Sequence, residues 1–242
     1  MRGELKNVII EVYLINASKG APSKGEKDMF FKSKAGYLTV EGSTVTSFDE
    51  YNCSNGVVVI PDYVTTIGRS AFARSSLCTV RFPSGLTTID SYAFNEVWHL
   101  EEVVIPYGVR RIGDGAFAGC RDLKSVYIPD SVEYIGQGAF QDCENLRSVR
   151  LPSGLKEITA AMFERCYSLT TVTIPTSVEF IRGFAFAHSG LRSIALPRSV
   201  RNIAAQHLFA GCTDLTSVTM PSGFDHVVHL MEIPAHCRIS YI

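Results

Sequence analysis

The sequence has little excess charge of either sign and no long apolar run. Its 242 residues carry a formal net charge of −1, so no bulk electrostatic attraction to nucleic acid or to an anionic membrane is implied. A membrane-spanning helix needs about 20 mostly apolar residues, and the apolar stretch near the start, residues 8–15, is interrupted by Glu11. Glu4 and Glu11 also break the pattern of a secretory signal. We therefore predict a strand at residues 8–15 and no membrane span.

Recognisable catalytic motifs are also missing. The chain contains no phosphate-binding G-x-x-x-x-G-K-S/T, no G-x-S-x-G, no H-E-x-x-H and no C-x-x-C. Its acidic residues are scattered and form no pair at a fixed place in the repeat described next. Without a visible nucleophile and base, we expect a non-enzymatic protein that needs no cofactor.

What the sequence does contain is a repeat of 22 to 24 residues. Two independent columns, one of proline and one of phenylalanine, share this period, which excludes chance. A fixed period between 20 and 50 residues indicates a solenoid, in which each unit buries its apolar face against its neighbours. The columns are Pro61, Pro83, Pro106, Pro129, Pro152, Pro175, Pro197 and Pro221, and Phe72, Phe94, Phe117, Phe140, Phe163, Phe186 and Phe209.

Each unit reads L-x-x-V-x-I-P, then V-x-x-I, then A-F. The alternation in V-x-I predicts a half-buried strand, which proline ends because it donates no ladder hydrogen bond. The V-x-x-I segment predicts a second short extended segment, and A-F predicts a core plug on a single turn of α- or 3₁₀-helix. The middle unit contains Leu123, Val126, Ile128, Pro129, Val132, Ile135, Ala139 and Phe140.

Four of the seven cysteines occupy one position of the repeat, where Ser75, Val97 and Ser189 stand in other units. A position shared by Cys, Ser and Val indicates a small buried slot, in which free cysteine behaves as a small hydrophobe. Stacked cysteines could also pair, because neighbouring coils lie at disulfide distance. We favour reduced, buried thiols at Cys120, Cys143, Cys166 and Cys212.

The frame L-x-x-V-x-I-P-x-x-V-x-x-I-G-x-x-A-F-x-x-C resembles the BspA-like, or treponemal-type, leucine-rich repeat. The pair Ala116-Phe117 with Cys120 three residues later is specific for that class. The resemblance implies a β-rich α/β solenoid: a right-handed coil of about seven repeats with a parallel concave β-sheet and a cap at each end. It covers residues 31–242.

The repeat boundaries predict four parts. Residues 1–30 form an N-terminal segment of strand and linker, and residues 31–56 an N-terminal cap. The leucine-rich repeats occupy residues 57–221. Residues 222–242, where the pattern decays, form a C-terminal cap, because terminal repeats of solenoids are atypical.

The resemblance also implies a function. Family members are commonly surface or secreted proteins of host-associated organisms that adhere to host or matrix proteins. We therefore expect an adhesin-like protein-interaction module, monomeric, with a protein partner such as a host or matrix protein on its concave face. An intracellular scaffold or adaptor is the alternative, and the sequence leaves the location open.

A metal-binding protein is a third and weaker alternative. It would use the cluster His226, His229, His236 and Cys237, since imidazole and thiolate at such spacings can bind zinc. The competing interpretation is that these are cap residues that face solvent or fill gaps.

The residue between V and I in each first strand should point out of the sheet. In the units that carry Arg81, Val104, Tyr127 and Arg150, this row is rich in the residue types of interface hot spots. We predict these four as the centre of a partner site, and the alternative is that they are ordinary solvated strand residues.

Phe180 and Phe184 are apolar where other units carry mostly polar residues. They indicate either a second contact patch or a pair of large side chains that cover the shortened loop at residues 189–190. The sequence does not decide between these.

Overall fold

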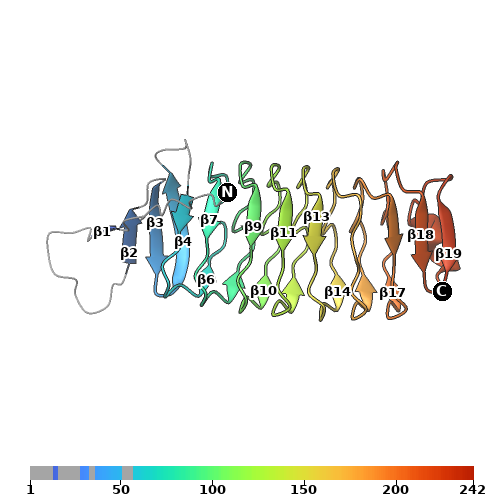
Figure 1. The fold of residues 1–242 in the computed structure, drawn as a ribbon, viewed down its shortest axis with the longest axis horizontal. Helices are drawn as coiled ribbons and strands as arrows, with labels where there is room; N and C mark the ends of the chain where they lie inside the picture. Colours follow the sequence, from blue (N-terminus) through green and yellow to red (C-terminus); the bar gives the residue numbers. More distant parts are fainter. Residues whose placement is uncertain (1–12, 16–27, 33–35, 51–56) are drawn as a thin grey trace, which may run out of the picture.

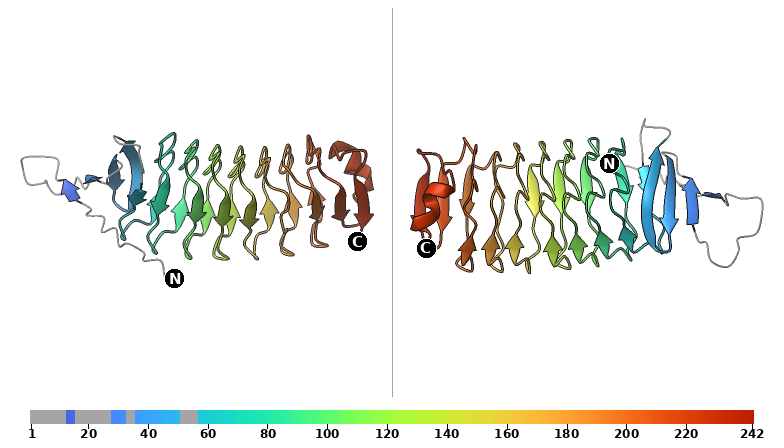
Figure 2. Two further views of the ribbon diagram at one scale, coloured as in Figure 1. Left: turned by 45° about the horizontal axis from the view of Figure 1, so that its top comes forward. Right: turned by 180° about the vertical axis from the view of Figure 1, so that it is seen from behind.

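The structure is a computed structural model that describes residues 13–15, 28–32, 36–50 and 57–242. Figure 1 shows a row of coils stacked along one axis, with an N-terminal group of strands at one end. Figure 2 shows that the row is nearly straight. The predicted solenoid is confirmed, with about eight turns and parallel sheets. Among the described residues the only helix is the 3₁₀-helix η1, Asp225–Leu230.

The first side of the coil is built from the V-x-I segments. Like residues of successive coils pair in parallel register, as Val126 does with Val103 and Val149. Ladders join β5 to β7, β9 to β11 and β13, and β16 to β18 and β19; the segment at residues 171–173 forms no strand. The strands are β5 Val57–Val59, β7 Thr79–Arg81, β9 Glu102–Val104, β11 Ser125–Tyr127, β13 Ser148–Arg150, β16 Ser193–Ala195, β18 Ser217–Met220 and β19 Arg238–Tyr241.

The second side is built from the V-x-x-I segments, whose last two residues form a short strand. Ile112, for example, pairs with Ile89 and Ile135 of the neighbouring coils. The isoleucine points into the core and the residue before it points outward. The strands are β6 Thr66–Ile67, β8 Thr88–Ile89, β10 Arg111–Ile112, β12 Tyr134–Ile135, β14 Glu157–Ile158, β15 Phe180–Ile181 and β17 Asn202–Ile203.

The third side consists of stacked turns, so the helical turn predicted around Ala-Phe is wrong. The Phe117 N–H donates to the Ala139 carbonyl of the next coil at 2.9 Å, while the Ala118 N–H closes a turn onto the Gly115 carbonyl at 3.0 Å. Because every second N–H is used between coils, no continuous helix can form. Gly115 has φ of 56°, a left-handed conformation that glycine adopts readily.

The phenylalanine column forms the centre of the core, as predicted. The seven rings are at most 1% exposed. Successive rings stack with centroids 5.0 to 6.0 Å apart and planes within 14° of parallel. Phe48 of the N-terminal cap extends the column, with its centroid 5.3 Å from that of Phe72.

Antiparallel strands form the N-terminal end. They are β1 Tyr13–Ile15, β2 Asp28–Lys32, β3 Gly36–Glu41 and β4 Thr44–Glu50, and β4 pairs in parallel with β6 of the first repeat. The predicted boundary between residues 30 and 31 falls inside β2. Most of the predicted N-terminal segment of strand and linker lies outside the described residues, at residues 1–12 and 16–27. The division into four parts stays a prediction.

The C-terminal end is covered by η1 and β19. β19 pairs in parallel with β18, matching Val218 to Ile239. Met231, just after η1, is fully buried. These residues therefore close the first side and the interior of the last coil.

Candidate functional site

Three of the predicted residues lie on adjacent strands of one ladder. Val104 ends β9, Tyr127 ends β11 and Arg150 ends β13, and Tyr127 pairs in register with both others. Their side chains point outward because the valine before each one faces the core, where Val103 and Val126 are buried and Val149 is half-buried. Val104 is 72% exposed and Tyr127 is 49% exposed.

Two further residues extend this surface from the turns that follow the proline column. Tyr107 follows Pro106 and is 80% exposed, and Asp130 stands at the equivalent position one coil later. We call Val104, Tyr107, Tyr127, Asp130 and Arg150 the tyrosine patch. Sequence reasoning missed Tyr107, although it is the only aromatic residue in a column otherwise made of Asp, Ser, Thr and Arg.

Arg150 is held in place across the patch. Its guanidinium donates from Nη2 to Asp130 Oδ2 at 2.9 Å and from Nη1 to the Ile128 carbonyl at 3.2 Å. The same group lies 5.2 Å from the centroid of the Tyr127 ring. These contacts hold the long Arg150 side chain in place. They leave the Tyr127 ring beside an ion pair whose charges cancel.

The electrostatics of the pair agree with its geometry. The Ser153 N–H, which donates to Asp130 Oδ1 at 2.7 Å, and then the Arg150 guanidinium lower the pKa of Asp130. The Asp130 carboxylate in turn raises the pKa of Arg150. Both groups therefore stay ionised at neutral pH, and the patch carries no net charge.

The fourth predicted residue, Arg81, lies outside the ladder that joins the other three. It ends β7, which pairs with β5 and has no ladder hydrogen bonds to β9. Its side chain is exposed, as predicted. The structure therefore brings Val104, Tyr127 and Arg150 together and leaves Arg81 outside that ladder.

Phe180 and Phe184 lie on another side of the coil. Phe180 is on β15 of the second side, with the guanidinium carbons of Arg182 and Arg201 at 5.6 and 5.7 Å from its ring centroid. Phe184, 40% exposed, stacks on His207 with centroids 4.8 Å apart. The two phenylalanines therefore cannot belong to the same contact surface as the tyrosine patch, and their role as a second patch stays a prediction.

The histidines of the C-terminal cap are not gathered into a metal site. His226 and His229 are exposed on η1, and His236 is exposed two residues before β19. Within the described part of the chain, no group of three or more His, Cys, Asp or Glu side chains could hold a metal ion. The geometry thus gives the metal-binding alternative no support.

The cysteine column is buried and its thiols are free, as predicted. Each thiol donates to the carbonyl of the preceding coil's phenylalanine, for example Cys143 Sγ to Phe117 O at 3.2 Å. Burial raises the pKa of Cys120 to about 12 and that of Cys143 well above its ordinary value. Burial also raises the pKa of Cys166 and Cys212.

Thiol titration of the native protein should leave Cys120, Cys143, Cys166 and Cys212 unmodified, since they are inaccessible and stay protonated. All four should react once the chain is denatured. Peptide mapping by mass spectrometry assigns the modified positions, and a Cys120–Cys143 or Cys143–Cys166 disulfide would contradict this assignment.

The pH dependence of stability gives a second test of the cysteine column. Folding raises the pKa values of these thiols, so their contribution to the stability of the fold should be fully present below the ordinary thiol pKa of 9.0. The free energy of unfolding should then fall as the pH rises above that value.

None of the helices in the described ranges is long and apolar enough to cross a membrane.

Taken together, stacked coils with parallel strands, a phenylalanine column and a cysteine slot define a leucine-rich repeat solenoid. The family model for the BspA type leucine rich repeat region matches in six copies, over residues 43–169 and 110–230. The chain therefore belongs to the BspA-type leucine-rich repeat family. No curated protein sequence matches it.

Solved structures with the same fold come from several bacteria. A leucine-rich repeat protein from Bacteroides ovatus is 23% identical with a TM-score of 0.58, over 98% of this chain and 67% of that one. The leucine-rich repeat protein of T. pallidum is 26% identical with a TM-score of 0.50, over 82% of this chain and 73% of that one. One from Eubacterium ventriosum is 25% identical with a TM-score of 0.53, over 70% of this chain and 52% of that one.

Proposed function

We propose that this protein is an adhesin-like interaction module that binds a protein partner through the tyrosine patch. The observation that carries the proposal is the exposure of Val104, Tyr107 and Tyr127 on adjacent coils, at 72%, 80% and 49%. Single exposed apolar residues are ordinary, whereas contiguous ones mark interaction sites. Tyrosine and arginine are also the residue types enriched in binding hot spots.

The chemistry of the tyrosine patch limits which kinds of partner surface can bind to it. Arg150 is already neutralised by Asp130, so the exposed surface consists of two rings, the Val104 methyl groups and one internal ion pair. Such a surface favours an apolar or aromatic patch on the partner over a strongly charged one. Binding should therefore depend only weakly on salt, because few unpaired charges face each other across the contact.

Each of the substitutions Tyr107→Ala and Tyr127→Ala should weaken partner binding by about 1–3 kcal/mol, the range of hot-spot truncations. The purified chain is passed over immobilised matrix-protein extract and, separately, over immobilised cell lysate. The retained partner is identified and titrated against the wild type and both variants. The unfolding midpoint should hardly change, because both rings are exposed.

Tyr134→Ala is the matched control. Its ring is also exposed, at 38%, but it lies on the second side under the Arg111 guanidinium. Normal binding by Tyr134→Ala and weak binding by Tyr127→Ala would support the patch. If Phe180→Ala or Phe184→Ala weakens binding while both patch variants bind normally, the contact is on another side of the coil. Retention by the matrix extract favours the adhesin, and retention by the lysate alone favours the intracellular scaffold.

A further inference from the structure

The second side of the solenoid ends on an uncovered strand. On the first side, β19 covers β18. On the third side, the N–H groups of His207 and Phe209 donate to Leu230 and Met231, at 2.9 and 2.8 Å. β17, Asn202–Ile203, is the last strand of the second side in the described ranges, and nothing pairs with its outer edge.

The backbone groups on this edge can be assigned from the ladder. The N–H groups of Asn202 and Ala204 donate back to Glu179 and Ile181, at 3.3 and 2.8 Å. Successive residues of a strand direct their backbone groups to opposite neighbours. The N–H and carbonyl of Ile203 therefore point away from the preceding coil, toward the open edge.

The carbonyl of Arg201 points the same way. The equivalent carbonyls of Arg110, Lys156 and Glu179 each accept N–H groups from the following coil. Across the described residues, no backbone donor reaches the Arg201 or Ile203 carbonyl. The edge thus presents one donor and two acceptors, in the spacing that the repeat itself uses for strand pairing.

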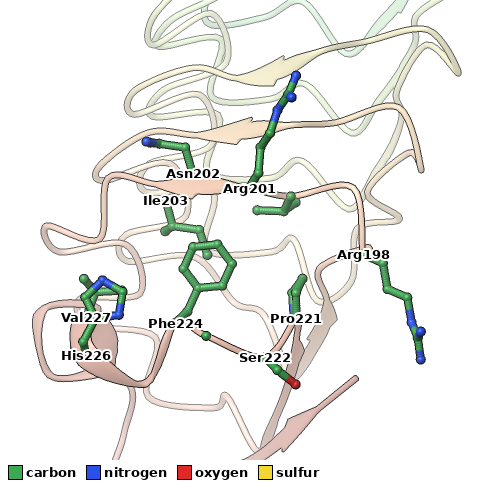
Figure 3. Close-up of a pocket in the computed structure, with 11 residues that line it drawn as sticks. Arg198, Arg201, Asn202, Ile203, Pro221, Ser222, Phe224, His226 and Val227 are labelled. Carbon is green, nitrogen blue, oxygen red and sulfur yellow. The ribbon is translucent and has the colours of Figure 1, made fainter.

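The edge is open because the chain forms a 3₁₀-helix where the next strand of the second side would lie. Phe224 and Val227 keep the spacing of the V-x-x-I segment, but residues 225–230 form η1 instead of a strand. This leaves a cavity of about 500 Å³ between β17 and residues 221–227, within the range of known ligand sites. Figure 3 shows Ile203 and Phe224 among the residues that line this cavity, with the Arg201 side chain extended back over the preceding coil.

A row of alternating charges ends at this edge. Successive coils place Arg110, Glu133, Lys156, Glu179 and Arg201 at one position. Arg110 Nη1 lies 2.6 Å from Glu133 Oε1 and Lys156 Nζ lies 3.3 Å from Glu179 Oε1. Arg201 also pairs with Glu179, so one carboxylate serves two cations.

If the alternation of charge continued, the next position in this row would carry a carboxylate, and the fold places none there. Its counterpart in the sequence is Asp225, the residue after Phe224, which begins η1 and hydrogen-bonds through its side chain to Tyr241. The alternation of charge therefore stops at an arginine, beside an unpaired strand edge.

We propose that β17 is a docking edge for an extended acidic segment of a partner protein. The segment adds as one more parallel strand, bonds the N–H and carbonyl of Ile203, and places an Asp or Glu opposite Arg201. Strand addition of this kind obtains affinity from backbone hydrogen bonds and specificity from side chains. This site is separate from the tyrosine patch and does not depend on it.

The chain supplies a suitable probe. Residues 131–136, Ser-Val-Glu-Tyr-Ile-Gly, make this addition within the fold: the Glu133 N–H donates to the Arg110 carbonyl and the Gly136 N–H to the Ile112 carbonyl, both at 2.9 Å. A synthetic peptide of this sequence with blocked ends is titrated into the full 242-residue chain. A second peptide carries Lys in place of Glu.

The glutamate peptide should bind the wild type about tenfold more tightly than the lysine peptide, because an attractive pair replaces a repulsive one. Arg201→Glu should reverse this preference and Arg201→Gln should remove it. Arg147→Gln, an exposed arginine elsewhere on the coil, should keep it. Before the comparison, an amide NMR spectrum of each variant shows that the variant is folded.

The decisive reading is amide hydrogen exchange at Ile203. Saturating glutamate peptide should slow this exchange about tenfold or more, as expected when a free N–H joins a ladder. Binding without protection of Ile203, or equal affinity for both peptides, overturns the proposal. Protection of Ile203 in the protein alone that grows with its concentration would show that a second copy of the chain occupies the edge, which also overturns it.

Discussion

Replacing Phe140 with alanine should lower the free energy of unfolding by about 3–5 kcal/mol, as expected for a large aromatic residue removed from a core. Phe140 is fully buried in the middle of the column, with ring centroids 5.6 and 5.9 Å from Phe117 and Phe163. Neighbouring coils are tied by hydrogen bonds on three sides and cannot move together to fill the space. The cavity should therefore remain.

Urea unfolding followed by circular dichroism measures this effect. Tyr134→Ala, an exposed ring on β12, is the control and should cost far less. Several transitions in place of one would show that the coils unfold separately. The change in the free energy of unfolding is then measured from the transition of the central coils. A Phe140→Ala variant within about 1 kcal/mol of the wild type would contradict the stacked core.

A chain that ends at Met220 should be less stable by about 3 kcal/mol or more. This truncation removes β19 from the edge of β18 and removes the fully buried Met231. Burying one such apolar side chain contributes about 1.5–3 kcal/mol, and Val228 and Ile239 pack against the same core. Solenoids also need a terminal cap to keep the apolar end of the stack out of water.

Thermal unfolding of the chain 1–220 and of the full chain tests the role of the cap. His229→Ala, an exposed change within η1, is the matched control and should unfold like the full chain. A truncated chain that melts at the same temperature as the full chain would show that residues 221–242 do not cover the core.

The repeat columns made most of the fold predictable from sequence. Each V-x-I and V-x-x-I segment has too few polar residues to face water on both sides. The spacing of its apolar residues therefore shows which side chains enter the core. The phenylalanine and cysteine columns followed from the same argument, since like residues of stacked coils must meet. The exposure of Tyr127 and Arg150 followed from the alternation around Val126 and Val149.

The turns and the ends were harder to predict. The Ala-Phe segment has the composition of a helical turn, but half of its N–H groups donate to the next coil, which only the stacked arrangement reveals. Phe224 and Val227 continue the repeat columns, but no strand forms there: Phe224 precedes the 3₁₀-helix η1 and Val227 lies within it. Tyr107 was overlooked because its position lies in a turn, outside the strand rows.

Photocrosslinking from position 107 tests the central claim most directly. A photoreactive phenylalanine analogue replaces Tyr107 in one protein and Tyr134 in another, and both are irradiated with the partner recovered from the extracts. A covalent complex from position 107 and none from position 134 is the expected result. A complex from position 134 alone would contradict the assignment of partner binding to the tyrosine patch.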